Sequence, residues 1–352
     1  MHFRIMTWNV ENLFRPAPSD PAAERTIYKR KLADTLVAHR IDVAAFQEIG
    51  SPEALDDLQH ALHGEYPHAA VSDQPDPRGI RVAILSRRPF EAVSQLPLLS
   101  DGHSHRGALA VQVQLSRRRV SIVTAHLKSK LLSFRGPDGT SAFTTSDEQL
   151  RAQVAAAALI QRTTEAVTLR NLASALLKPS TLTTDGHTAR QHRARKPVIL
   201  LGDLNDVPEA ATTQILLGPP GSQPGTRAFA RADDGDSARL FNLANFIPLE
   251  RRYSRINNGV PELIDHILVS EDWLPERREP TVDANVTSSA PYRQWAKTPK
   301  PGEVRKSPIT HPLPPSSNSA EHSHAFVMHL PASTKTWLDT ERARAPLPPN
   351  RN

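Results

Sequence analysis

The stretch Val198-Ile-Leu-Leu-Gly-Asp-Leu-Asn-Asp206 is a short apolar run that ends in a glycine followed by acidic and amide side chains. An apolar run of this length, bounded by turn-forming residues, predicts a buried strand. Side chains at a strand end lie on rigid backbone and can converge with side chains from neighbouring strands. The stretch therefore predicts a core strand that brings polar groups to a site at its carboxyl end.

Similar apolar runs predict the rest of a sheet-rich fold. The strands are expected at 3–8, 42–47, 79–86, 107–115, 119–126, 197–202, 263–270 and 323–330. Helices are expected at 24–39, 52–62, 146–176 and 208–217, and Ser146 with Gln149 matches a capping box for the third helix. Because strands and helices alternate irregularly, the pattern favours a mixed-sheet α/β or α+β sandwich over a parallel barrel.

The chain shows no internal repeat and no hinge between two cores, so one domain is predicted over residues 1–330. Loop insertions are expected at 131–145, 178–196 and 218–238, the first two of them polar. The segment 280–319, rich in Pro, Ser, Lys and Arg, is expected to form a longer excursion. Residues 331–352 are charged and Pro-rich, and are expected to form a tail.

Composition narrows the chemistry. The 43 Lys and Arg against 37 Asp and Glu give a formal charge of +6, which suits a polyanionic partner without requiring one. Cysteine is absent, which excludes disulfides, thiolate metal sites and a cysteine nucleophile, so any metal must bind oxygen and nitrogen. Residues 1–8 do not match a secretion signal and no apolar run reaches membrane-span length, so a cytoplasmic protein without a membrane partner is expected.

Several further polar motifs lie at predicted strand ends. They are Trp8 to Asn12, Phe46 to Glu48, Thr124 to Lys128, Leu263 to His266 and Ala320 to His322. Taken singly, each has an ordinary structural explanation, such as a helix cap at Glu48 or a turn at Asn9. Their shared position at strand ends favours one common site.

Together these motifs resemble the endonuclease/exonuclease/phosphatase superfamily, which includes deoxyribonucleases, abasic-site endonucleases, inositol polyphosphate 5-phosphatases and bacterial sphingomyelinases. The resemblance rests on Trp-Asn-Val-Glu-Asn at 8–12, Gln-Glu at 47–48, Ala-His-Leu-Lys-Ser at 125–129, Gly-Asp-Leu-Asn-Asp at 202–206 and Ile-Asp-His-Ile at 264–267. It runs from residue 3 to about residue 330. It implies a four-layer α/β sandwich, in which two packed mixed sheets are flanked by helices and the site lies at one edge.

The resemblance also implies a metal site. Phosphodiester hydrolysis requires neutralised phosphoryl oxygens and an activated water, which suits a hard cation held by carboxylates. By resemblance, Glu48 is the principal ligand of Mg²⁺ or Mn²⁺. Asn9, Glu11 and Glu321 support it, and Glu11 stands where some relatives have Asp.

Other site residues are implied around the phosphate. Asp203 and Asn205 would position the attacking water and the phosphate, with Asp203 a candidate general acid or base. His126 would face the scissile phosphate as a hydrogen-bond donor. Lys128 and Arg106 are the expected substrate phosphate contacts.

The last motif departs from the family pattern. Asp265 and His322 are expected to form a pair in which the carboxylate orients the imidazole. Relatives usually read Ser-Asp-His here, whereas this chain reads Ala320-Glu-His-Ser-His324, so His324 or His311 could also take the base position. His322 is favoured because an acidic residue precedes it and an apolar strand follows at 325–328.

Three functions compete. The first is a metal-dependent phosphodiesterase that cleaves nucleic acid, DNA more than RNA, as an endonuclease; the basic charge and the Arg-rich segments 190–196 and 293–306 favour it. The second is a phosphatase or phospholipase that acts on inositol phosphates or sphingomyelin, since one fold supports both chemistries. The third is a non-catalytic binding protein, which the altered motif at Glu321 leaves open.

Overall fold

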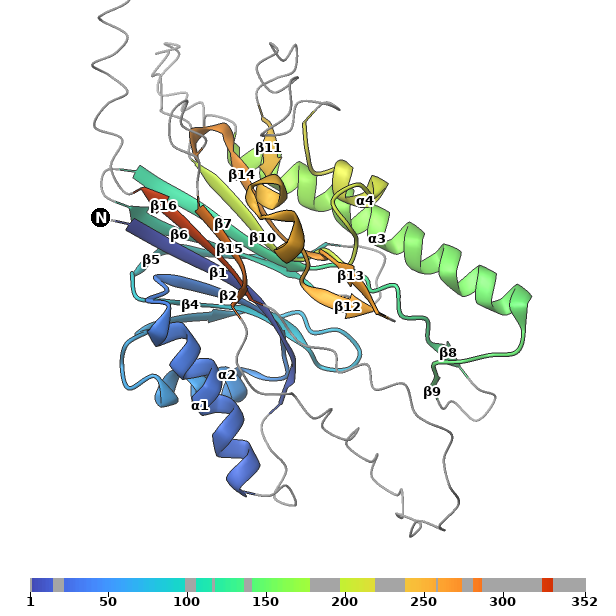
Figure 1. Cartoon of the computed structure of the whole chain (residues 1–352), viewed down its shortest axis with the longest axis horizontal. Coiled ribbons are helices and arrows are strands. Elements are labelled where there is room, and N and C mark those ends of the chain that lie inside the picture. Colours follow the sequence, from blue (N-terminus) through green and yellow to red (C-terminus); the bar gives the residue numbers. More distant parts are fainter. Residues whose placement is uncertain are drawn as a thin grey trace, which may run out of the picture.

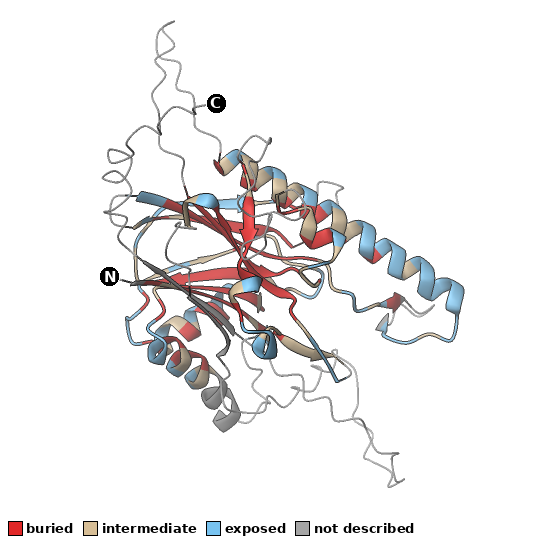
Figure 2. Ribbon diagram, turned by 45° about the horizontal axis from the view of Figure 1, so that its top comes forward, coloured by how far each residue is buried: buried red, intermediate tan, exposed pale blue. Residues whose placement is uncertain are grey.

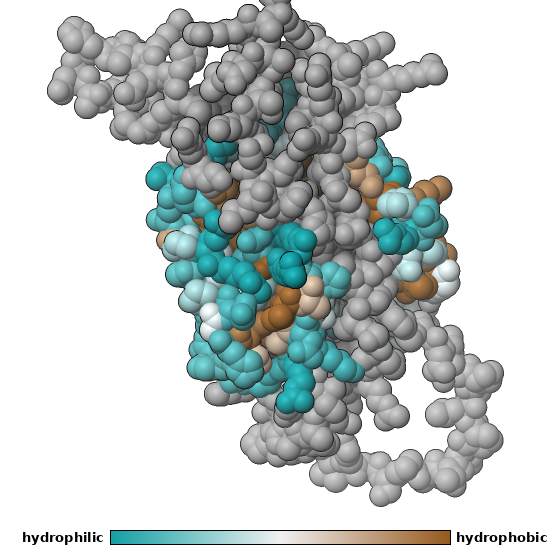
Figure 3. Space-filling view, turned by 60° about the vertical axis from the view of Figure 1, so that its left-hand side comes forward, coloured by the Kyte–Doolittle hydropathy of each residue, from teal (hydrophilic) through white to brown (hydrophobic). Residues whose placement is uncertain are grey.

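The architecture comes from a computed structural model of the chain, which describes residues 2–14, 22–98, 106–115, 118–135, 141–177, 197–218, 238–257, 259–273, 281–286 and 325–331. Two six-stranded sheets face one another across a shared core, with helices on their outer faces (Figure 1). The described helices include none that is both long and apolar enough to cross a membrane. On the face shown in Figure 3, the described surface is largely hydrophilic with small apolar patches.

The first sheet has the order β15-β16-β1-β2-β4-β3. Its strands are β1 (His2–Leu13), β2 (Val43–Ile49), β3 (His68–Val71), β4 (Arg81–Ser86), β15 (Thr281–Val286) and β16 (Ala325–Pro331). β1 and β2 run parallel, and the other neighbouring pairs run antiparallel. The parallel pair at the centre brings the carboxyl ends of β1 and β2 to one edge.

The second sheet repeats this arrangement, with the order β11-β14-β10-β7-β6-β5. Its strands are β5 (Phe90–Leu96), β6 (Ala108–Leu115), β7 (Arg118–His126), β10 (Val198–Asp203), β11 (Leu240–Asn242) and β14 (Asp265–Ser270). β7 and β10 form its parallel pair, and its other pairs are antiparallel. Each sheet therefore ends two central strands at the same edge.

Helices and short elements complete the fold. The α-helices are α1 (Ala22–Ala38), α2 (Pro52–Ala61), α3 (Glu148–Leu177) and α4 (Ala211–Gln214). The short elements are β8 (Phe134–Arg135), β9 (Ser141–Ala142), β12 (Arg255–Asn257), β13 (Val260–Glu262) and the 3-10 helices η1 (Leu243–Phe246), η2 (Leu249–Arg251) and η3 (Glu271–Trp273). α1 and α2 cover the first sheet and α3 covers the second.

Buried apolar side chains define three interfaces between four layers. One cluster, which includes Ile5, Val43, Ile122 and Leu201, fills the space between the sheets. A second joins the first sheet to α1 and α2, and a third joins the second sheet to α3. Figure 2 shows this burial concentrated in the sheets. The predicted four-layer α/β sandwich with two mixed sheets is confirmed.

Several local predictions were wrong. α3 begins at Glu148, and the side chain of Asp147, not Ser146, accepts the hydrogen bond from the Leu150 amide at 2.9 Å. In the segment 208–217, only Ala211–Gln214 is α-helical. The excursion predicted at 280–319 starts too early, because Thr281–Val286 forms β15 against β16.

Strands β3 and β5 lacked a sequence prediction because both are poorly buried and so carry little hydrophobic periodicity. The predicted insertion 131–145 contains the small β8–β9 hairpin. The insertion 178–196, most of 218–238, the remainder of 280–319 and the tail 332–352 lie outside the described residues.

Candidate active site

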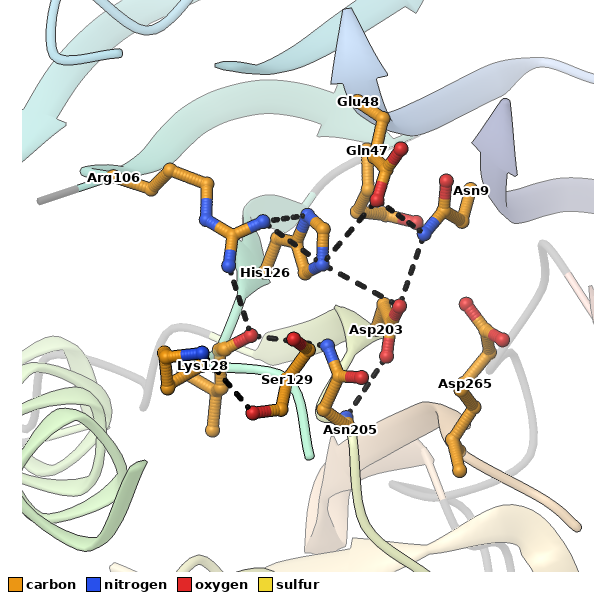
Figure 4. A network of polar contacts seen from close by, with 12 residues as sticks. Asn9, Gln47, Glu48, Arg106, His126, Lys128, Ser129, Asp203, Asn205 and Asp265 are labelled. Atoms are coloured by element: carbon orange, nitrogen blue, oxygen red, sulfur yellow. Dashed lines mark hydrogen bonds and ion pairs between the residues drawn. The ribbon is translucent and has the colours of Figure 1, made fainter. Parts of the chain in front are cut away.

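Polar side chains from both sheets meet at the edge where the parallel strands end (Figure 4). Asn9 comes from β1 and Glu48 from β2. His126 is the last residue of β7, Asp203 is the last of β10, and Asp265 is the first of β14. The sandwich thus brings together groups that are far apart in the chain, since Asn9 and Asp265 are separated by 256 positions.

Backbone irregularities aim the two groups of the first sheet. The pairing of β2 with β4 shifts register between Gln47 and Ile49, and Glu48 between them has a left-handed φ of 67°. β-Bulges of this kind turn a side chain out of the regular alternation and occur next to active sites. The bulge therefore directs Glu48 out of the sheet and toward the site.

A second irregularity lies in β1, whose pairing with β2 shifts register between Asn9 and Leu13. Glu11 and Asn12 in this segment have left-handed φ angles of 45° and 61°. The backbone N–H of Glu11 donates to Oδ1 of Asn9 at 2.9 Å, which fixes the amide of Asn9. The bend thus orients Asn9 through its own backbone.

Gly202 allows β10 to approach β7 closely before Asp203. Its φ is 147°, and a Cβ at this position would overlap the carbonyl oxygen of Ala125 in β7. Only glycine tolerates that approach without backbone strain. The glycine therefore lets Asp203 lie beside His126, its register partner in the parallel pair.

Asn9 links the two sheets at the centre of the site. Its Nδ2 donates to Oδ2 of Asp203 at 3.0 Å and lies 3.4 Å from Oε1 of Glu48. Nearby, the buried side chain of Gln47 donates to Oγ1 of Thr124 at 3.0 Å and accepts from Thr7 at 3.3 Å. Buried hydrogen bonds of this kind hold the sheets in register where the carboxylates meet.

His126 is buried between a cation and two carboxylates. Nη1 of Arg106 lies 2.6 Å from Nδ1 and 2.9 Å from Nε2 of the imidazole. Arginine only donates, so we assign Nδ1, the ring nitrogen closer to Arg106, as the acceptor and place the ring proton on Nε2, the nitrogen near the carboxylates. Nε2 then faces Oδ2 of Asp203 at 3.5 Å and Oε1 of Glu48 at 3.9 Å.

Burial and the neighbouring Arg106, Arg78 and Lys128 charges lower the pKa of His126 well below its usual value. The imidazole is therefore neutral at physiological pH. A neutral imidazole with its proton on Nε2 can donate a hydrogen bond to an oxygen placed at the site.

The acidic groups show the opposite perturbation. Burial raises the pKa of Asp203 to about 6, although hydrogen bonds from Asn9 and Asn205 oppose the rise. Burial and the charge of Asp203 raise the pKa of Asp265 well above its usual range. Oδ1 of Asp265 is buried and has no hydrogen-bond partner among the described residues. The charged forms of these buried carboxyl groups are therefore disfavoured, and a bound cation would stabilise them.

The loop after β7 is held by hydrogen bonds to its main chain. The carbonyl of Leu127 accepts from Arg106 at 3.2 Å and from Asn205 at 3.0 Å. The amide of Lys128 donates to Glu165 at 2.6 Å, and its carbonyl accepts from Arg162 at 3.0 Å. Because these main-chain groups have fixed partners, the loop forms a rigid wall of the site.

A sequence model of the endonuclease/exonuclease/phosphatase family matches residues 6–296. The chain belongs to this family. Members of the endonuclease/exonuclease/phosphatase family are hydrolases that act on phosphoester bonds. A search of curated protein sequences finds no match.

Solved structures of the endonuclease/exonuclease/phosphatase family share the fold. The human nocturnin catalytic domain with bound sulfate anion has 14% identity and a TM-score of 0.51, covering 93% of this chain and 94% of that chain. A family protein from Bacteroides thetaiotaomicron has 14% identity and a TM-score of 0.51, covering 94% and 98%. A mannosyl-6-phosphatase from Bacteroides thetaiotaomicron VPI-5482 has 15% identity and a TM-score of 0.51, covering 93% and 99%.

The donor set of the site fits a hard divalent cation. The described residues contain no cluster of three or more His, Asp and Glu that would enclose a metal. Mg²⁺, however, is commonly held by one or two carboxylates and keeps several waters. Glu48 matches that mode of binding, because it is partly exposed and lies beside the amide of Asn9. The buried carboxyl groups of Asp203 and Asp265, whose pKa values are raised, lie in the same site.

The remaining predicted residues have mixed placements. Asn205 has a left-handed φ of 55°, and its backbone amide donates to Oδ1 of Asp203 at 2.8 Å, so it holds that carboxylate. Nζ of Lys128 lies 3.3 Å from the carbonyl of Ser129 and 3.5 Å from that of Leu131, so reaching a phosphate requires a side-chain rotation. Glu321, His322, His324 and His311 lie outside the described residues.

Sequence patterns missed Arg162 and Glu165, which hold the wall loop. Both lie on the buried face of α3 together with Ala158, Ala166 and Leu169. A charged pair within the apolar stripe of a helix was the signal that could have revealed them, because buried charges require specific partners.

Proposed function

We propose that this chain is a divalent-metal-dependent phosphodiesterase that hydrolyses nucleic acid, and that DNA is its substrate in an endonucleolytic reaction. The observation that carries the proposal is the opposition of two kinds of group across one small site. Glu48 and Asp203 lie on one side, and Arg106 lies behind a neutral His126 on the other. A phosphodiester needs both a cation for its oxygens and donors for its developing charge.

Glu48 is the proposed principal ligand of Mg²⁺ or Mn²⁺, with Asn9, Glu11 and Glu321 in support. When bound, such an ion neutralises charge on the phosphoryl and leaving oxygens. Asn9 is already fixed by Glu11 through the 2.9 Å hydrogen bond to its Oδ1. Little rearrangement of the backbone is then needed for binding.

Asp203 is the proposed group that orients the attacking water and receives its proton. Its pKa, raised to about 6 chiefly by burial, lies close to physiological pH, where a general base is most effective. The backbone amide of Asn205 fixes one of its oxygens and Asn9 the other. The carboxylate is therefore preorganised rather than free to rotate.

His126, with its proton on Nε2, is proposed to donate a hydrogen bond to a phosphoryl oxygen. Arg106 holds this tautomer and adds positive charge, and Lys128 completes the donor side. Asp265 is proposed to orient His322. Its Oδ1 is buried and has no hydrogen-bond partner among the described residues, so it can accept a hydrogen bond from the imidazole.

The formal charge of +6 and the Arg-rich segments 190–196 and 293–306 support DNA over a small phosphate ester. The test is incubation of the purified protein with supercoiled plasmid, linear duplex DNA, RNA and a phosphomonoester. Each substrate is treated with Mg²⁺, with Mn²⁺ and with chelator.

We expect plasmid nicking that requires a metal. Hydrolysis of the phosphomonoester without plasmid nicking would replace the proposal with the phosphatase alternative. Cleavage that continues in chelator would refute the metal assignment.

A further inference from the structure

An exposed aromatic ring lies at the rim of the site, directly after the bulged end of β1. Phe14 is 42% exposed. A Cβ at Gly50 would overlap its ring atoms Cγ, Cδ1 and Cε1, so the ring lies against the bare backbone of Gly50. Gly79 also faces the ring edge. The ring therefore rests on two glycines, and Gly50 is only two residues beyond Glu48.

The support under this ring is fixed by hydrogen bonds. The amide of Gly50 donates to the carbonyl of Leu13 at 2.7 Å, and the amide of Phe14 donates to Asn12 at 2.7 Å. Nη1 of Arg81 donates to the carbonyl of Gly79 at 2.9 Å and to that of Gly50 at 3.3 Å. An exposed aromatic ring on a rigid support is preorganised for stacking, since few torsions remain to be ordered on binding.

The same rim continues to the catalytic groups. The amide of Gly79 donates to the carbonyl of Asp76 at 2.8 Å. Oδ2 of Asp76 lies 3.2 Å from Nε of Arg78 and 4.0 Å from Nε of Arg106, which contacts His126. A chain of contacts therefore joins Phe14 to the proposed phosphate site. Arg78 belongs to this chain of contacts through its ion pair with Asp76, and 55% of its side chain is exposed to solvent.

A nucleotide presents the two chemistries that this rim offers, an anionic phosphate and a flat base. We propose that Phe14 and Arg78 form a nucleotide subsite beside the scissile bond, in which Phe14 stacks on an unpaired base and Arg78 contacts the adjoining phosphate. The inference rests on the proposed function and adds that the substrate strand is single-stranded or opened at this position. Stacking on an aromatic ring is tolerant of base identity, so little sequence preference is expected.

The test compares two strands of equal length and charge, a single-stranded oligodeoxynucleotide and a strand composed of abasic tetrahydrofuran nucleotides. Phe14→Ala should lower kcat/KM for the base-containing strand by about 5- to 150-fold, the range for loss of one stacked base. It should leave kcat/KM for the abasic strand unchanged. Phe14→Tyr should retain wild-type values.

Two controls separate stacking from support of the fold. Phe14→Leu keeps an apolar contact on Gly50 but lacks the aromatic face, so it should behave as Phe14→Ala. Phe143→Ala removes a phenylalanine of similar exposure, 45%, next to the β9 hairpin strand and should not discriminate between the strands. Arg78→Ala should weaken binding of both strands and reduce its salt dependence by about one released counterion.

The possible outcomes are distinct. If Phe14→Ala lowers kcat/KM equally on both strands, or on neither, the base platform is refuted while the proposed nuclease activity stands. If the wild-type protein cleaves neither strand and nicks no plasmid, the proposed function itself fails and the subsite fails with it.

Discussion

Replacement of His266 by glutamine should remove much of the acid sensitivity of folding. His266 is buried with 1% exposure; its Nε2 lies 2.8 Å from the carbonyl of Asp206, and the amide of Asn242 lies 3.0 Å from its Nδ1. Carbonyls only accept, so Nε2 carries the proton and Nδ1 accepts from Asn242. A second proton on Nδ1 would face the Asn242 donor inside the core. Burial accordingly lowers the pKa of His266 from 6.5 to about 4.

The direction of the pH effect on the free energy of unfolding follows from how the folded and unfolded states bind protons. Below pH 6.5 the unfolded chain takes up a proton at this histidine, whereas the folded chain does so only near pH 4. The free energy of unfolding therefore falls as pH falls through this window. The shift corresponds to about 3.4 kcal/mol in full, and to about 2 kcal/mol between pH 7 and pH 5, at about 1.36 kcal/mol per pKa unit.

Urea unfolding at pH 7 and pH 5, in chelator, measures this effect. Asp203 and Asp265 act in the opposite direction, because burial raises their pKa values and folding then favours their protonated forms. The difference between wild type and His266→Gln cancels their contribution. The amide of glutamine can donate to Asp206 and accept from Asn242, so the variant should fold. An unchanged pH dependence in the variant, or a His266 pKa near 6.5 by NMR titration, would refute the reasoning.

Three further predictions concern the site directly. Glu48→Gln should abolish activity and the heat of Mg²⁺ binding in calorimetry while preserving the circular dichroism spectrum, because it removes one ligand charge; normal cleavage would show that the metal site is misplaced. His322→Ala should lower kcat by about 10²- to 10⁴-fold at saturating Mg²⁺, whereas His324→Ala and His311→Ala should have mild effects. If one of the latter is the inactive variant, the histidine that pairs with Asp265 must be reassigned. Gly202→Ala should lower the free energy of unfolding by about 2 to 6 kcal/mol in urea denaturation, the sum of overpacking and backbone strain, and a variant as stable as wild type would contradict the close approach of β10 to β7.

The core strands were predictable because buried strands consist largely of apolar residues, which can be recognised in the local sequence. The run 197–202 is apolar throughout, as expected for a strand covered on both faces, and 119–126 carries the apolar residues Val120, Ile122, Val123 and Ala125. β3 and β5 were not predictable, since they lie at sheet edges where partial exposure removes the apolar signal. The start of α3 was misplaced by two residues because Ser146 and Asp147 are both acceptable caps, and only the backbone path selects between them.

The sequence by itself determined which residue types carry the chemistry. Asn9, Glu48, His126 and Asp203 come at the ends of predicted strands and Asp265 comes at the start of one, and short-range pattern is sufficient to place a polar group at a strand end. Only the tertiary structure decided how these groups act on one another. The bulge that turns Glu48, the Arg106 guanidinium that selects the His126 tautomer and the burial that raises the pKa of Asp203 all arise from segments distant in the chain. Electrostatic perturbation depends on distance and burial in three dimensions, and neither is a property of a local stretch of sequence.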